Sequence, residues 1–300
     1  MNLSAHHHAL ARTALFSAAI FWGSSFFIMK NVVSVFPANY LMAIRFSIAT
    51  LLLGIIFHKR LRDNLNVSAF KAGALVGFTL FLGYFAQTVG LTGTTPGKNA
   101  FLTAVYCVIV PFLYWFVNKT RPDAYSIVAA FLCIAGIGLV SLSSDLTISA
   151  GDGLTLLCGF FFACNIVAVA QCGKKMDVIV LTILQFGFAA LCCWICGFLF
   201  ETWPAVIPTS SLWELAYLSV IVTAVAFLFQ NIGIKWENPS AASIILSLEA
   251  VFGVLFSVLF YGEALTPRLC LGFIIIFCAV ILSETKLAFL PFGVKKRTDP

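Results

Sequence analysis

Ten apolar stretches, each about as long as one bilayer crossing, take up most of the 300 residues of this chain. A helix needs about 20 mostly apolar residues to cross the hydrocarbon core of a membrane. Proline, glycine or charged residues separate each stretch from the next. The stretches lie near residues 13–34, 39–57, 71–92, 97–117, 123–143, 151–171, 178–200, 212–234, 240–260 and 267–288. The sequence therefore predicts ten transmembrane helices.

Composition excludes a soluble protein. Hydrophobic residues make up 61% of the chain and charged residues 10%, whereas soluble domains are about 25% charged. A soluble fold of this size leaves much of its surface in water and has no room to bury so many apolar side chains. Runs such as LCLGFIIIFCAVIL (Leu269–Leu282) lack the alternation of barrel strands. Because backbone groups in lipid must bond internally, we expect an all-α polytopic membrane protein.

The basic residues favour one side of the membrane. If the N-terminus is cytoplasmic, Lys30, Lys98 and Arg268 lie outside and Arg45 lies within a span. The cytoplasmic set is Arg12, Lys59, Arg60, Arg62, Lys71, Lys119, Arg121, Lys174, Lys175, Lys235, Lys286, Lys295, Lys296 and Arg297. This bias predicts that both termini are cytoplasmic. The charges are spread over short loops, which is typical of contact with anionic lipid rather than nucleic acid.

A phrase in the first half of the chain returns in the second. QTVGLTGTTPGKNA begins at Gln87, and its counterpart QNIGIKWENPSAAS begins at Gln230. The similarity extends over the flanking spans, and IFWGSSFF from Ile20 resembles FFFACNIV from Phe160 at a slightly different offset. We therefore expect two five-helix repeats, residues 1–145 and 146–300.

Because five is an odd number, the second repeat starts on the opposite side of the membrane. Inverted repeats of this kind are typical of secondary transporters, whose binding sites lie near the midplane where the repeats meet. Thr95-Pro96 and Asn238-Pro239 each read as a helix N-cap followed by proline at the first helical position.

Three stretches resemble one known group, the EamA-type branch of the drug/metabolite transporter superfamily. They are FWGSSFFIMKN (21–31), AIRFSIATLLL (43–53) and PSAASIILSLEAVFGVLFSVLFYGEALTP (239–267). The resemblance implies ten helices, with eight around a central cavity and the fifth and tenth outside it. It also implies alternating access, efflux of small organic solutes such as amino acids or related metabolites, and a place in the bacterial inner membrane.

Ionisable residues within spans are costly in lipid and are therefore functional candidates. Glu249 lies near the middle of the ninth span, where it would bind substrate or couple transport to protons; the alternative is a structural pairing with Lys30, Arg45 or an aromatic donor. Arg45 would bind a carboxylate or extend towards the headgroups. For Lys30 we expect extension to the headgroups.

The predicted substrate-binding set combines these charges with polar and aromatic side chains inside the spans. A cavity with one acid, one base, amides and rings would suit a zwitterion, and Tyr106 is the repeat equivalent of Glu249. The set is Trp22, Arg45, Tyr84, Gln87, Asn99, Tyr106, Asn165, Gln185, Gln230 and Glu249.

The function predicted from the sequence is secondary active transport of a small solute, with protons as a candidate coupling ion. The alternatives are an intramembrane enzyme or a channel-like protein. The four histidines lie at positions 6–8 and 58, and no hydrolase or nucleotide-binding motif is present. We therefore expect no catalytic residue, cofactor or metal, and either a monomer or a homodimer.

Overall fold

The computed structural model describes residues 3–119, 121–141, 148–237 and 239–285, and within these ranges its elements are helices. The first half contains α1 (Leu3–Val32), α2 (Ala38–Ile56), α3 (His58–Asn64), α4 (Val67–Thr92), α5 (Pro96–Thr103), α6 (Tyr106–Asn118) and α7 (Ala124–Ser141). The second half contains α8 (Ala150–Cys172), α9 (Val178–Phe200), α10 (Thr209–Tyr217), the π-helical η1 (Leu218–Val225), α11 (Ala226–Trp236), α12 (Pro239–Phe256), the π-helical η2 (Ser257–Tyr261) and α13 (Pro267–Thr285).

Each expected span coincides with one apolar helix or with consecutive helices in the structure. Within the described residues, seven of these segments are long and apolar enough to cross a membrane: His8–Val32, Ala38–Ile56, Val67–Thr92, Pro96–Asn118, Ala150–Cys172, Val178–Phe200 and Thr209–Trp236. Three further apolar helices are shorter there: Ile127–Val140, Leu248–Tyr261 and Pro267–Ala279. The protein is therefore an all-helical, polytopic membrane protein.

Two expected spans are less regular than their apolar runs suggest. In the fourth, α5 ends at Thr103 and α6 begins at Tyr106, and Pro111 within α6 has no N–H to continue the helical ladder. In the eighth, η1 separates α10 from α11, and the Thr223 hydroxyl donates to the Leu218 carbonyl at 2.7 Å. A π-helical turn of this kind is frequent at functional sites.

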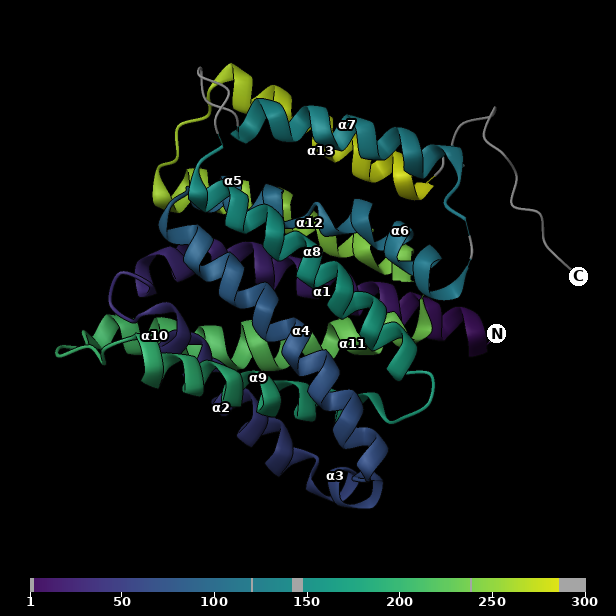
Figure 1. Ribbon diagram of the computed structural model, residues 1–300, viewed down its shortest axis with the longest axis vertical. Helices are drawn as coiled ribbons and strands as arrows, with labels where there is room; N and C mark the ends of the chain where they lie inside the picture. The colour runs from purple at the N-terminus through teal and green to yellow at the C-terminus, as the bar shows by residue number, and fades with distance from the viewer. Residues whose placement is uncertain (1–2, 120, 142–147, 238, 286–300) are drawn as a thin grey trace, which may run out of the picture.

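The two halves pack as counterparts of one another (Figure 1). Helix α2 contacts α9, and α7 contacts α13, so each of these helices meets its own repeat equivalent. Helices α4 and α8 pack together, and so do their counterparts α11 and α1. The α7–α13 pair lies at one edge of the bundle, and α2 and α3 lie at the opposite edge. The pair exposes apolar side chains, including Phe131 at 70% and Ile274 at 59%, which suits contact with lipid.

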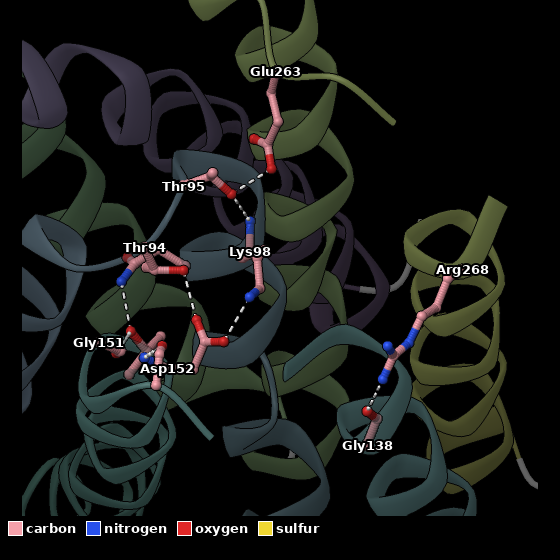
Figure 2. A network of polar contacts seen from close by, with 11 residues as sticks. Thr94, Thr95, Lys98, Gly138, Gly151, Asp152, Glu263 and Arg268 are labelled. Atoms are coloured by element: carbon pink, nitrogen blue, oxygen red, sulfur yellow. Dashed lines mark hydrogen bonds and ion pairs between the residues drawn. The ribbon is translucent and has the colours of Figure 1, made fainter. Parts of the chain in front are cut away.

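A polar network joins the α4–α5 turn to two other parts of the bundle (Figure 2). Asp152, at the start of α8, accepts from the Thr94 hydroxyl and from Lys98 Nζ, both at 2.6 Å. Glu263, which follows η2, accepts from the Thr95 hydroxyl and from the Gly97 N–H. An ion pair and several hydrogen bonds therefore hold the α4–α5 turn and the start of α5 against α8 and against the segment that follows η2.

Two sequence expectations concern the same end. Thr95 caps α5 by accepting from the Lys98 N–H, with Pro96 at the first helical position, as predicted; Asn238 lies outside the described residues. Lys30, which we expected to extend to the headgroups, donates from its Nζ to the carbonyls of Leu91 and Thr94 at 2.6 and 2.8 Å. These carbonyls lie at and beyond the end of α4, where a cation is favoured.

Candidate functional site

A cavity with about 440 Å³ of space not filled by atoms lies between α1, α4, α6, α8, α11 and α12. Six of the thirteen lining residues are aromatic, and the others include amides, a serine hydroxyl and one carboxyl group. The lining consists of Trp22, Ser25, Phe26, Tyr84, Gln87, Tyr106, Phe162, Asn165, Ile166, Phe227, Gln230, Leu246 and Glu249.

Twelve of these thirteen residues form six pairs that relate the first half of the chain to the second. Three pairs share one sequence offset: Trp22 and Phe162, Ser25 and Asn165, and Phe26 and Ile166. Three more share the slightly larger offset of the repeated phrase: Tyr84 and Phe227, Gln87 and Gln230, and Tyr106 and Glu249. Both halves of the chain therefore contribute matched positions to one cavity.

Aromatic rings close the cavity from several sides. The ring centroids of Trp22 and Phe227 are 4.8 Å apart, and those of Tyr84 and Phe162 are 5.2 Å apart. Tyr84 also meets Phe227 at 5.9 Å, so four rings from four helices form one cluster. Rings at such separations attract one another by dispersion and by edge-to-face electrostatics. A bound solute would lie among aromatic faces.

The hydrogen-bond donors of the lining are mostly used within the protein. The Asn165 amide donates to the Val76 carbonyl at 2.9 Å, and the Trp22 indole donates to the Val222 carbonyl at 3.0 Å. Gln87 Nε2 donates to the Thr103 hydroxyl at 3.2 Å. Gln230 Nε2 lies 3.4 Å from Asn231 Oδ1, and Ser25 donates to a carbonyl of its own helix.

Glu249 is the single carboxyl group among the lining residues, and its residue is 4% exposed. Lys30 and Arg45, the partners that the sequence suggested, bond elsewhere. Tyr106 lies close enough to interact electrostatically with Glu249. Its hydroxyl nevertheless has no partner with ordinary hydrogen-bond geometry in the described part of the chain. The carboxyl therefore meets a phenol rather than a cation.

Arg45 is fully buried but does not line the cavity. Its Nη2 and Nε donate to the Thr223 hydroxyl at 2.9 and 3.1 Å, and its guanidinium lies 5.3 Å from the centroid of the Tyr84 ring. Arg45 thus joins α2 to the π-helical turn and to the back of one cavity ring. Extension to the headgroups is excluded by this burial.

Replacing Thr223 by Val is expected to lower the free energy of unfolding by about 2 kcal/mol, because the buried guanidinium loses the oxygen that accepts two of its hydrogen bonds. Denaturation in detergent micelles measures the loss. Thr223→Ser keeps the hydroxyl and should cost less than half as much. Equal losses for the two variants would contradict this account of Arg45.

Two other predicted residues lie outside the cavity. Asn99 is buried and donates to Thr155 Oγ1 at 2.8 Å and to the Gln87 carbonyl at 3.3 Å, so it joins α5 to α8 and α4. Gln185 is the repeat equivalent of Arg45, at the same offset that relates Trp22 to Phe162. It is fully buried, and neither atom of its amide has a partner in the described part of the chain.

Seven predicted residues therefore meet around one cavity, while Arg45, Asn99 and Gln185 do not. The sequence interpretation overlooked Phe162 and Phe227 as lining residues. A signal for them was present, because they are the repeat equivalents of Trp22 and Tyr84. No group of three or more potential metal ligands occurs in the described part of the chain.

The family model of EamA-like transporters matches this chain twice, over residues 10–142 and 149–285. The chain belongs to the EamA-like transporter family. It is a membrane transporter rather than an enzyme, and the resemblance in three sequence stretches is confirmed.

Two further comparisons agree. A curated protein of Archaeoglobus fulgidus named "Uncharacterized transporter" is 32% identical over 269 residues, which cover 90% of this chain and 84% of that protein. A solved structure described as "Crystal structure of protein" aligns with a TM-score of 0.71 at 19% identity, over 94% of this chain and 98% of that one. The second likeness concerns the fold alone.

Proposed function

We propose that this EamA-like protein is a secondary active transporter that exports a small organic solute by alternating access. The solute is an amino acid or a related metabolite, and it binds in the cavity between the two halves. The observation that carries this proposal is the pairing of Trp22 with Phe162, Tyr84 with Phe227 and Tyr106 with Glu249 around one space. A site built equally from two repeats can open to either side when one half rocks against the other.

The proposal includes two inverted five-helix repeats, residues 1–145 and 146–300, and ten crossings. The family model supports the division because it matches each half separately. The distribution of lysine and arginine supports the inverted topology and cytoplasmic termini. Export and an inner-membrane location rest on the family resemblance.

Uptake into proteoliposomes tests the transport itself. The purified protein is first screened for thermal stabilisation by amino acids, amines, nucleosides and sugars, because a ligand at 100 times its dissociation constant should stabilise by about 2.7 kcal/mol. Radiolabelled hits are then followed into liposomes with and without a pH gradient. If the protein is a transporter, the flux saturates with increasing solute concentration and the labelled solute shows counterflow. If it is a channel, the flux keeps rising with solute concentration and counterflow is absent.

A matched pair of variants on α8 tests whether the solute passes through the cavity. Phe162 lines the cavity, whereas Phe160 is 41% exposed on the same helix and does not. Phe162→Ala should change the apparent affinity for the solute at least fivefold, and Phe160→Ala should leave it within twofold. Flux that neither substitution alters would place the path elsewhere, and no saturable flux for any hit would reject the proposal.

A further inference from the structure

We propose that, within the class of amino acids and related metabolites, the preferred solute is a derivative that carries a protonated amine and an aromatic or apolar body but no free carboxylate; this rests on the proposed transport function. The sequence alone pointed to a zwitterion, because it offered Glu249 and Arg45 as an acid and a base for one cavity. The structure places only the acid there. Without Arg45, the lining contains an acid and no basic side chain.

Charge is the first argument. Glu249 is the one lining side chain that carries a carboxyl group, and no lysine or arginine is among the lining residues. Arg45 donates to Thr223, and Lys30 donates to backbone carbonyls at the end of α4. An ammonium group beside Glu249 would pair with the ionised form of its carboxyl group, for which the lining offers no other cation. A carboxylate in the same space would add a second negative charge without one.

Hydrogen bonding is the second argument, and it is independent of the first. Both N–H groups of the Asn165 amide donate to protein atoms, the Val76 carbonyl and the Thr79 hydroxyl, whereas Gln87 and Gln230 each donate one N–H. Within the described residues, no hydrogen bond to the side-chain oxygens of these three amides is found. The assignment at Asn165 is firm, because its partner Val76 O is a carbonyl that can only accept. The lining thus offers the oxygen of Asn165 to a ligand that donates, and the oxygens of Gln87 and Gln230 beside one remaining N–H on each.

The aromatic rings supply the third argument. Trp22, Phe162 and Phe227 belong to the ring cluster of the cavity. The negative faces of such rings attract cations, and their area suits an apolar body. Tyr84 already has the guanidinium of Arg45 at 5.3 Å, which shows that this ring cluster accommodates a cation at its edge. A carboxylate gains nothing from these faces.

Four ligands with one common ring separate the charge types. They are 2-phenylethylamine, the methyl ester of phenylalanine, phenylalanine and 3-phenylpropionate, which present a cation, a cation with a masked carboxylate, a zwitterion and an anion. Dissociation constants come from stabilisation against concentration at pH 7. The amine and the ester should each bind at least tenfold more tightly than phenylalanine, and phenylpropionate should be the weakest.

The same titrations are made on the Glu249→Gln variant. We expect its dissociation constants for the amine and the ester to rise at least tenfold, and its dissociation constant for phenylalanine to stay within threefold of that of the unaltered protein. Glu214→Gln is the matched control, because Glu214 lies on α10 outside the cavity and bonds Asn31. If Glu249→Gln does not give a folded protein, the order of the four ligands on the unaltered protein decides the question.

Phenylalanine binding as tightly as its ester would overturn the amine assignment and leave the transport proposal standing, since the cavity would still bind a solute. The absence of binding by all four ligands would also overturn the assignment. The transport proposal would then be judged by the wider screen and by flux. The transport proposal and the amine assignment would both be rejected only if no ligand found in the thermal screen gave saturable flux.

Discussion

Replacing Lys98 by Met is expected to lower the free energy of unfolding by about 3 kcal/mol, because removing one partner of a buried ion pair leaves the other charge uncompensated, at a cost of about 3–5 kcal/mol. Lys98 Nζ lies 2.6 Å from Asp152 Oδ2, and the Asp152 side chain is fully buried. We expect the lower end of that range, because the Lys98 side chain is 21% exposed and Thr94 still donates to Asp152. Methionine keeps the apolar stem and removes the charge.

A double-mutant cycle separates the ion pair from the packing of each side chain. Asp152→Asn removes the negative charge and keeps the size of the side chain. The double variant Lys98→Met/Asp152→Asn should be more stable than Lys98→Met alone, because the charge without a partner is gone. Denaturation in detergent gives all four values. If the loss of unfolding free energy in the double variant equalled the sum of the losses in the two single variants, Lys98 and Asp152 would not be energetically coupled.

Much of the fold could be predicted because spans are a local property of the sequence. In lipid the backbone N–H and C=O groups must hydrogen-bond to one another, so each apolar run between proline, glycine or charged residues becomes a helix. The run at 178–200 coincides with α9 to the residue. The early start of α1 was not predicted because its first residues are polar, and the π-helical turn at η1 was not predicted because its apolar run looks like any other span.

The site could be predicted in part for a different reason. The repeat relates pairs of positions, so Glu249 and Tyr106, or Gln87 and Gln230, were expected to share a cavity. Arg45 does not line the cavity, and the sequence did not indicate this because a span gives the depth of a side chain but not the direction in which it points. That direction depends on the rotation of α2 against η1, which no pattern in one chain fixes.

The Lys98–Asp152 pair shows the same limit. Its members are far apart in the sequence and belong to helices of different repeats. Charge counting assigned Lys98 to a loop, and Asp152 was not singled out. Only the packing of α4, α5 and α8 brings them together. Ion pairs between helices of different repeats, such as Lys98–Asp152, are therefore the contacts least predictable from the sequence.

The largest functional effect is expected for Glu249→Gln, which should reduce accumulation driven by a pH gradient at least tenfold in proteoliposomes. Glu249 is buried in the cavity, and its carboxyl group is in no ion pair among the described residues. A proton and an ammonium group are two ways of compensating the same carboxylate, and they exclude each other at one site. Release of the amine to one side and binding of a proton from that same side would then be linked through this single group, and the reverse exchange would occur on the opposite side.

Glutamine keeps the shape of the side chain and cannot exchange a proton, so the variant should lose its response to the gradient while any residual flux becomes independent of pH. Glu249→Asp keeps the carboxyl group and should retain part of the gradient-driven accumulation. Glu214→Gln, outside the cavity, should behave as the unaltered protein. If Glu249→Gln accumulates solute as well as the unaltered protein does, Glu249 does not couple protons to transport. Its burial among the rings would then serve only to bind the solute.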